Sequence, residues 1–263
     1  MTDAMQFRWT SCSCSHVGLV RQVNEDACLE QADRGLWAVA DGMGGHTLGD
    51  LASRLVVESL NQLPPAANLE KFMLDARDRL QTVNRQLRGE AAARGVRIIG
   101  STVAALLAHG SRFGCLWAGD SRIYLYRDQR LQRLTRDHSQ IEEMKARGNL
   151  GDDDVLAHVA RNLITRAVGV ADVLELDERV MELNDGDVFL LCSDGLSNEV
   201  SEQELSEVLE DGNCEQATRL LVDLALQRGG HDNISVVATR AKDLYGSEKT
   251  VLNPGLAEQV RSD

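Results

Sequence analysis

Four aspartates in this chain stand at the ends of strongly apolar segments. Three of them end such a segment: Asp41 follows "LWAVA", Asp120 follows "GCLWAG" and Asp194 follows "VFLLCS". The fourth, Asp232, begins one in "DNISVVA". A carboxylate at the end of a buried strand is costly unless a partner compensates its charge. These four residues are therefore the first candidates for chemistry.

The expected geometry of such strand ends suggests what the chemistry is. In an antiparallel pair, the end of one strand lies beside the beginning of its neighbour. We therefore expect Asp232 beside one of the other three aspartates, at one edge of a sheet. Carboxylates gathered there would repel each other unless cations held them, and hard oxygen ligands suit Mg²⁺ or Mn²⁺. The pattern predicts a divalent-metal site.

Asp-Gly pairs are also ordinary turn signals, which gives a second interpretation. The chain contains four of them, at 41–42, 185–186, 194–195 and 211–212. The pairs at 185 and 211 end no strongly apolar segment, so we interpret them as plain turns. For the pairs at 41 and 194 a turn and a metal ligand both remain open, and the repeated strand-then-acid order favours the metal.

The segment "VRQVNEDA" places Arg21 close to Glu25 and Asp26. One interpretation is a surface ion pair worth less than ~1 kcal/mol. The other is functional: the planar guanidinium of Arg21 binds an anionic substrate, while the two acids accept hydrogen bonds from metal-bound waters.

The elements that must position these residues alternate along the chain without a clear linker. Apolar spacing predicts a helix over 50–63, a long helix that begins at an Asn68 cap and ends near Gly95, and a helix over 214–228. Ser201 and Glu204 form a predicted capping box. A hairpin is expected with its turn at 127–130, and "NISVVATR" is expected as the closing strand. Clustered strands with paired helices favour antiparallel sheets with helices packed outside.

Two segments differ from this pattern. Residues 140–162 form a long polar connection that contains "GDDD", which suggests a functional flap. Residues 242–263 lack periodicity and are predicted to be a mobile C-terminal tail. The predicted domain therefore covers residues 7–241.

Composition narrows the class of protein. The 263 residues are 43% hydrophobic, and the formal net charge of −13 argues against nucleic-acid or anionic-membrane partners. No apolar run approaches the ~20 residues that span a bilayer, and the first residues lack the order of a secretion signal. We therefore expect a cytoplasmic protein whose six scattered cysteines are reduced thiols.

Eight short motifs follow one another in an order that is recognisable as a set. They are "RQVNED" (21–26), "DGMGGH" (41–46), "GSTVAA" (100–105), "AGDSR" (118–122), "LTRDHS" (134–139), "LITRAVG" (163–169), "CSDGL" (192–196) and "GGHDNISVV" (229–237). Together they resemble the PP2C-type (PPM) metal-dependent serine/threonine protein phosphatases of the bacterial branch. The resemblance covers roughly residues 7–240.

The resemblance implies an α+β fold, a four-layer α-β-β-α sandwich of two antiparallel sheets flanked by helices. It also implies a two-metal Mn²⁺ or Mg²⁺ centre. Position by position, Asp41 would bridge both metals, the Gly42 carbonyl would bind one, and Asp194 and Asp232 would complete the other. Asp120 would hold a third, weaker cation.

The remaining motif residues take supporting roles by the same resemblance. Arg21 would hold the phosphate, Glu25 and Asp26 would support the metals from behind, and Asn233 would orient Asp232. His46 either protonates the leaving group or only supports the glycine turn.

The activity that the resemblance implies is hydrolysis of phosphoserine and phosphothreonine on proteins. A metal-bridging hydroxide would attack phosphorus directly, and the enzyme would oppose a serine/threonine kinase in signalling. The alternative is a catalytically weak relative that binds phosphoproteins or acts in partner switching. Such a relative would be expected to lack Asp41, Asp194 or Asp232, and all three are present. The sequence gives no sign of the oligomeric state.

Other chemistries are less well supported. Cys28 and Arg34 have the spacing of a cysteine phosphatase loop, but the residues between them, "LEQAD", hold two acids and no glycine. The residues of "CSCSH" (12–16) are too tightly spaced to close a zinc tetrahedron. His231 is interpreted as local structure.

Overall fold

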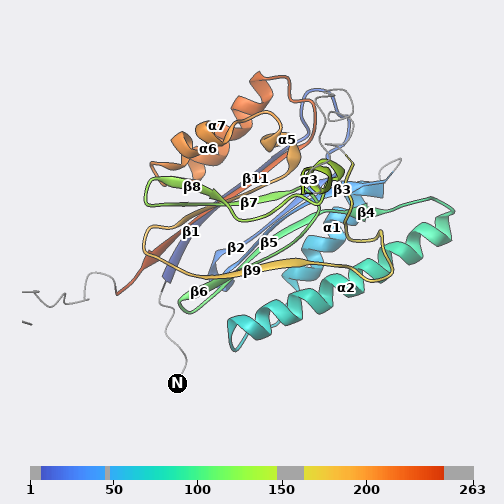
Figure 1. The fold of residues 1–263 in the computed structure, drawn as a ribbon, viewed down its shortest axis with the longest axis horizontal. Helices are drawn as coiled ribbons and strands as arrows, with labels where there is room; N and C mark the ends of the chain where they lie inside the picture. Colours follow the sequence, from blue (N-terminus) through green and yellow to red (C-terminus); the bar gives the residue numbers. More distant parts are fainter. Residues whose placement is uncertain (1–6, 45–47, 147–162, 246–263) are drawn as a thin grey trace, which may run out of the picture.

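The computed structural model describes residues 7–44, 48–146 and 163–245, and these residues form two β-sheets with helices on their outer faces (Figure 1). Every strand pair within the sheets is antiparallel. The fold class predicted from the sequence is therefore confirmed.

The first sheet has the strand order β1-β11-β10-β7-β8. Its members are β1 (Phe7–His16), β11 (Ile234–Asp243), β10 (Val188–Cys192), β7 (Arg122–Arg127) and β8 (Arg130–Arg133). The predicted hairpin is β7–β8, and its two turn residues, Asp128 and Gln129, have φ of 51° and 58° without being glycine. The strand β11 includes the first two residues that were assigned to the tail.

The second sheet has the order β2-β3-β5-β6-β9, and β4 pairs with β3 beside this path. Its members are β2 (Asp26–Gln31), β3 (Leu36–Met43), β4 (Gly100–Ser101), β5 (Val103–His109), β6 (Arg112–Ala118) and β9 (Asp177–Glu182). A short 3₁₀ turn, η1 (Ala32–Arg34), joins β2 to β3. Because β6 and β7 belong to different sheets, the turn between them crosses from one sheet to the other.

Helices cover the outer face of each sheet (Figure 1). The helices α1 (Leu48–Asn61) and α2 (Leu69–Arg94) pack on the second sheet, and α5 (Asp194–Ser197), α6 (Glu202–Leu209) and α7 (Cys214–Gln227) pack on the first. A further helix, α3 (Gln140–Ala146), opens the connection that was predicted to be a flap; residues 147–162 of that connection lie outside the described residues.

Three apolar cores lie between these four layers. One joins α1 and α2 to the second sheet, one lies between the sheets, and one joins the first sheet to α5–α7. The middle core contains fully buried aromatic side chains such as Trp37, Phe113 and Phe189. It fixes how the sheets face each other and therefore which strand ends meet.

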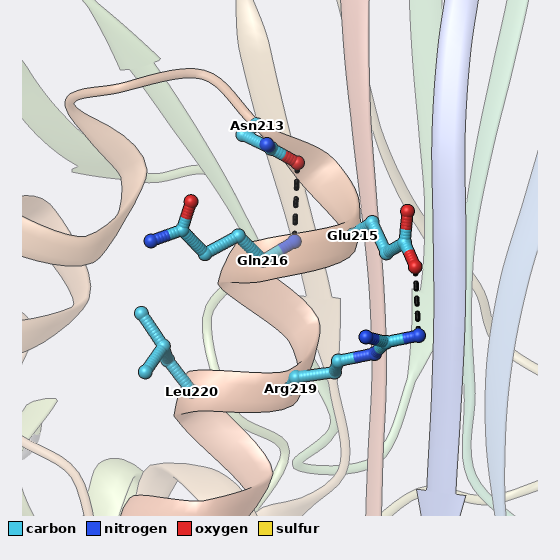
Figure 2. A pocket seen from close by; sticks show the side chains of 5 residues that line it. All are labelled: Asn213, Glu215, Gln216, Arg219 and Leu220. Atoms are coloured by element: carbon cyan, nitrogen blue, oxygen red, sulfur yellow. Dashed lines mark hydrogen bonds and ion pairs between the residues drawn. The ribbon is translucent and has the colours of Figure 1, made fainter.

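Helix ends follow the signals in the sequence. The Asn68 side chain accepts from the Lys71 N–H at 2.8 Å, and Gly95 ends α2 with φ of +65°. Ser201 and Glu204 form the predicted capping box. The first turn of α7 has an Asn213 cap, which accepts from the Gln216 N–H at 3.1 Å, and an exposed ion pair between Glu215 and Arg219 (Figure 2).

The shallow pocket at this end of α7 carries none of the predicted site residues. It is lined by five residues around the first turns of the helix: Asn213, Glu215, Gln216, Arg219 and Leu220 (Figure 2). The helix has 14 residues and is therefore about 21 Å long, with Asp232 beyond its other end. We therefore assign no role in the reaction to this pocket.

None of the described helices is both long enough and apolar enough to cross a membrane.

Candidate active site

Both sheets contribute carboxylates to one end of the interface between them. Asp41 lies in β3 and pairs in register with Asp26 of β2. In the other sheet, β10 and β11 pair so that Cys192 faces Val236, which brings Asp194 after β10 close to Asp232 before β11. Asp120 lies in the β6–β7 turn that joins the two sheets. We call these five residues the carboxylate cluster.

Burial and mutual repulsion raise the pKa of four members of the cluster. Burial is the largest cause for Asp41, whose pKa lies well above its ordinary value, followed by repulsion from Asp26 and Asp194. Burial raises the pKa of Asp26 to about 7, and it does the same for Asp120, which Asp194 also repels. Burial and the Asp232 charge raise the pKa of Asp194. Each shift means that the negative charges lack compensation.

Two oxygens of the cluster have no partner within the described structure. They are Oδ1 of Asp26 and Oδ1 of Asp120, both of them buried. The other oxygen of Asp26 accepts a hydrogen bond from Ser193 Oγ at 2.8 Å. Buried oxygens without a hydrogen-bond partner are rare. Carboxylate oxygens with free lone pairs are the ligands that hard divalent cations bind. The donor set therefore fits Mg²⁺ or Mn²⁺.

The side chains would have to rearrange to enclose a cation. In the described part of the chain, no three histidine, cysteine or acidic side chains already surround one point closely enough to hold a metal. Arg21 Nη2 lies 2.8 Å from Asp232 Oδ2, so the guanidinium takes the place of a cation at that oxygen. The hydrogen bond to Asp232 is the largest cause of the raised pKa of Arg21, and Asp41 and Asp194 raise it further.

Asn233 positions the loop that carries Arg21. Its side-chain amide donates to the carbonyls of Val17 (2.9 Å) and Val23 (3.0 Å), and its Oδ1 accepts from the Glu25 N–H at 2.8 Å. The contact with Asp232 is made by the Asn233 backbone N–H instead, which donates to Oδ1 at 2.8 Å. The Asn233 side chain therefore clamps the Arg21 loop, while the backbone of the same residue contacts Asp232, which Asn233 was predicted to orient.

Glu25 supports the start of α1. Its Oε1 accepts from the Gly49 N–H at 3.1 Å, and its backbone carbonyl accepts from the Gly42 N–H at 3.0 Å. A Cβ at Gly42 would lie 2.0 Å from the Gly49 carbonyl oxygen. Glycine is therefore required here by the close packing of β3 against α1, a reason that is separate from any approach of the Gly42 carbonyl to a metal.

Sequence reasoning overlooked a set of hydroxyl groups that hold the aspartates. Thr102 Oγ1 accepts from the Asp41 N–H at 2.9 Å and hydrogen-bonds to Ser121 Oγ at 2.7 Å. Ser193 Oγ joins Asp26 to the other sheet and accepts from the Ser235 N–H at 3.0 Å. All of these residues stood inside quoted motifs, and two of them, Ser121 and Ser193, stand directly beside an aspartate, which was the available signal. His46 lies outside the described residues.

The structure gives no support to a cysteine mechanism. Burial, followed by the charge of Asp26, raises the pKa of Cys28 to about 12, so its thiol stays protonated. Arg34 is occupied elsewhere, because its guanidinium donates to the carbonyls of Asn61 (2.7 Å) and Leu63 at the end of α1.

Two histidines that were weighed as metal ligands also have local partners. His16 Nδ1 accepts from the Gly18 N–H at 2.9 Å, and His231 Nδ1 lies 2.8 Å from Glu199 Oε1 on the surface. Both contacts fit the structural interpretation of these side chains.

Comparisons with known proteins place this geometry in context. A family model described as protein phosphatase 2C matches residues 13–221. The serine/threonine protein phosphatase PstP of Mycobacterium tuberculosis is 36% identical over 240 residues, which cover 89% of this chain and 46% of that protein. The chain thus spans about half the length of this relative. The serine/threonine phosphatase stp of Listeria welshimeri is 34% identical, covering 84% of this chain and 91% of that one.

Two solved structures are similar throughout. PppA, described as a key regulatory component of T6SS in Pseudomonas aeruginosa, has a TM-score of 0.83 and 45% identity, covering 89% of this chain and 97% of that one. The catalytic domain of the phosphatase PstP, solved with two manganese ions, has a TM-score of 0.81 and 34% identity, covering 90% and 100%.

Proposed function

The chain belongs to the protein phosphatase 2C family, and from this membership we propose that it is an enzyme that hydrolyses phosphoserine and phosphothreonine on proteins with the help of divalent cations. The observation that carries the proposal is the carboxylate cluster, in which buried aspartates from both sheets converge without enough compensating charge.

Mn²⁺ or Mg²⁺ bound at the cluster would supply an activated water and would neutralise charge on the phosphoryl group. We assign Asp41 to both of two cations, because its carboxyl group is repelled by all four of the other aspartates of the cluster. The Gly42 carbonyl would serve one of them, and Asp194 with Asp232 would serve the other. Asp120 would hold a third and weaker cation. Glu25 and Asp26 would accept hydrogen bonds from water molecules bound to these cations.

Arg21 is suited to bind the phosphate of the substrate. Its side chain is 53% exposed at the edge of the cluster. Its loop is held by the Asn233 side chain and by a hydrogen bond of 2.7 Å from the Leu19 N–H to the Gly230 carbonyl. A cation on Asp232 Oδ2 would displace the guanidinium and leave its planar donors free for phosphate oxygens. Arg21 would then neutralise charge that develops during in-line attack.

The expected partners are phosphorylated proteins and a serine/threonine kinase that makes them. The net charge of −13 disfavours long-range attraction of acidic phosphoproteins, so recognition would rest on short-range contacts at the site. His46, four residues after Gly42 in the sequence, is our candidate proton donor for the leaving oxygen.

The proposed function predicts a strict metal requirement. Phosphate release from a phosphothreonine peptide should need Mn²⁺ or Mg²⁺, should stop with a chelator and should return when metal is added back. A phosphotyrosine peptide and nucleotides measured in parallel define the substrate class. Full activity after rigorous metal removal would contradict the two-cation centre, and binding of the phosphopeptide without turnover would favour the partner-switching alternative.

Replacing Arg21 with alanine should raise KM for the phosphothreonine peptide by roughly 10-fold, with a smaller loss of kcat, because most of its contact with phosphate is made in the ground state as well. The matched control is Arg219→Ala, which removes an arginine that is 71% exposed on α7 and pairs with Glu215. Steady-state kinetics of both variants decide the point. A KM equal to that of the unchanged protein would show that the phosphate is bound by other residues.

A further inference from the structure

The segment around His138 packs directly against the turn that carries Asp120. The His138 backbone N–H donates to the Gly119 carbonyl at 2.8 Å, and the Gly119 N–H donates to His138 Nδ1 at 3.2 Å. A single residue therefore satisfies both polar backbone groups of Gly119, the residue immediately before Asp120. This histidine belongs to the "LTRDHS" motif, which the proposed function leaves without a role.

The imidazole ring is itself held on three sides. It is 7% exposed and stacks on Trp117, with ring centroids 6.3 Å apart and an interplanar angle of 12°. Nε2 lies 3.2 Å from Asp177 Oδ2 in a close contact of imperfect alignment. Asp177 pairs in register with Trp117 and is held by Arg166 Nη1 at 2.9 Å. The ring thus has one defined orientation.

These contacts also define the tautomer of His138. Burial lowers the pKa of the ring, with the nearby Asp177 carboxylate opposing this effect, so the neutral form is favoured. Because Nδ1 accepts from Gly119, the proton of the neutral ring is on Nε2 and points to Asp177. A carboxylate that orients a histidine in this way fixes what the opposite ring nitrogen can do.

Gly119 needs such support because of its conformation. Its φ is +111°, and a Cβ there would lie 2.6 Å from Thr102 Cγ2, so the chain bends sharply between β6 and Asp120. Asp120 is 8% exposed, and its Oδ1 has no partner in the described part of the protein. The direction of that oxygen therefore depends on the backbone of the turn.

We propose that His138 is a positioning residue that, through its Nδ1 bond to the Gly119 N–H, aims the Asp120 carboxylate into the active site. This inference rests on the role that the proposed function gives to Asp120. His138 touches neither substrate nor phosphate, and its effect passes through the backbone of one glycine.

Two substitutions separate the Nδ1 contact from the packing of the ring. In His138→Asn the amide oxygen takes the place of Nδ1 and still accepts from Gly119. In His138→Gln the amide reaches toward Asp177 and leaves the Gly119 N–H without a partner. We expect kcat for a phosphothreonine peptide to fall roughly 10-fold in the glutamine variant, the size of one lost hydrogen bond, and to stay within about 2-fold in the asparagine variant.

Two further measurements, the affinity for Mn²⁺ and the rate with a second substrate, should change if His138 positions Asp120 and should not change if its ring only fills space. Calorimetric titration with Mn²⁺ should show a lower affinity of the weakest site in His138→Gln and an unchanged affinity of that site in His138→Asn. The affinities of the tighter sites should be unchanged in both variants. An activated aryl phosphate, whose leaving group needs little protonation, should be affected less than the peptide by His138→Gln. Equal behaviour of the two variants would show that the ring only fills space and would overturn the proposal.

Asp120→Ala provides the control for the role of Asp120 itself. If Asp120→Ala lowers kcat and His138→Gln adds nothing to it in the double variant, His138 acts through Asp120 as proposed. An additional loss in the double variant would place the action of His138 elsewhere and reject the inference alone. Wild-type rates in Asp120→Ala would reject the third-cation role in the proposed function, and the inference with it.

A further variant covers the case in which both substitutions of the buried ring unfold the protein. Asp177 is 44% exposed, and Asp177→Ala keeps the ring but removes the carboxylate that orients it, so the Nδ1 contact with Gly119 is weakened and not lost. We expect a smaller loss of affinity at the weakest Mn²⁺ site and a smaller loss of kcat than in His138→Gln. Unchanged metal binding and turnover in Asp177→Ala would then overturn the proposal.

Discussion

Replacing Asp41 with asparagine should lower kcat/KM for a phosphothreonine peptide by roughly 10³-fold or more, the effect of removing a major electrostatic group from a catalytic centre. Asp41 is the residue that both proposed cations share, and asparagine keeps its shape while removing its charge. Calorimetric titration should show that Mn²⁺ binds more weakly and with lower stoichiometry.

The same substitution should stabilise the metal-free protein, which separates a lost site from a lost fold. The Asp41 carboxyl group is destabilised by burial and by repulsion from Asp26 and Asp194, and a neutral amide escapes both effects. We expect a higher melting temperature without metal and a smaller increase on adding Mn²⁺. Asp211→Asn, at the exposed Asp-Gly turn between α6 and α7, is the matched control and should change neither property. Turnover near wild type in Asp41→Asn would refute the proposed centre.

The metal-free protein should also lose stability as the pH rises from about 4 to about 8. The ordinary pKa of an aspartate is 3.8, and in the folded protein the pKa of Asp26 and of Asp120 is about 7. A raised pKa means that the folded state keeps a proton which the unfolded chain has lost. The resulting stabilisation is complete below about pH 4 and disappears as the pH rises through about 7.

The size of this change should be a few kcal/mol, since one pKa unit corresponds to about 1.4 kcal/mol and coupled carboxyl groups do not contribute independently. Urea unfolding at pH 5, 6, 7 and 8 with a chelator present measures it. Saturating Mn²⁺ should flatten or reverse the trend, because cations bind the deprotonated carboxylates of the folded state. A metal-free protein that gains stability between pH 5 and pH 8 would disprove the repulsion within the cluster.

Much of the fold could be predicted from the sequence because its signals are local. The Asn68 cap, the Ser201–Glu204 capping box and the end of α2 at Gly95 each depend on residues a few positions apart. A position for Asp232 beside one of the other three strand-end aspartates was predicted too, and the pairing of β10 with β11 makes that neighbour Asp194.

The contacts between the sheets could not be predicted in the same way. Apolar alternation shows that a strand has a buried face but does not show which strand of another sheet packs against it. The bond from Ser193 to Asp26 joins residues 167 positions apart, and the Asn233 clamp on Val17 spans 216. The reason for glycine at position 42 likewise appears only when the start of α1 lies against it.

The pairing of β1 with β11 has a consequence for how the protein is made. These strands stand near opposite ends of the described chain and pair over ten residues, from Phe7 with Asp243 to His16 with Ile234. On the ribosome, β1 emerges early and its partner emerges roughly 10–50 s later at ordinary rates of synthesis. The loop that holds Arg21 depends on Gly230 and Asn233, so it cannot be fixed before that time. The nascent polypeptide therefore stays inert until β11 has left the ribosome, because the loop that holds Arg21 becomes fixed only then.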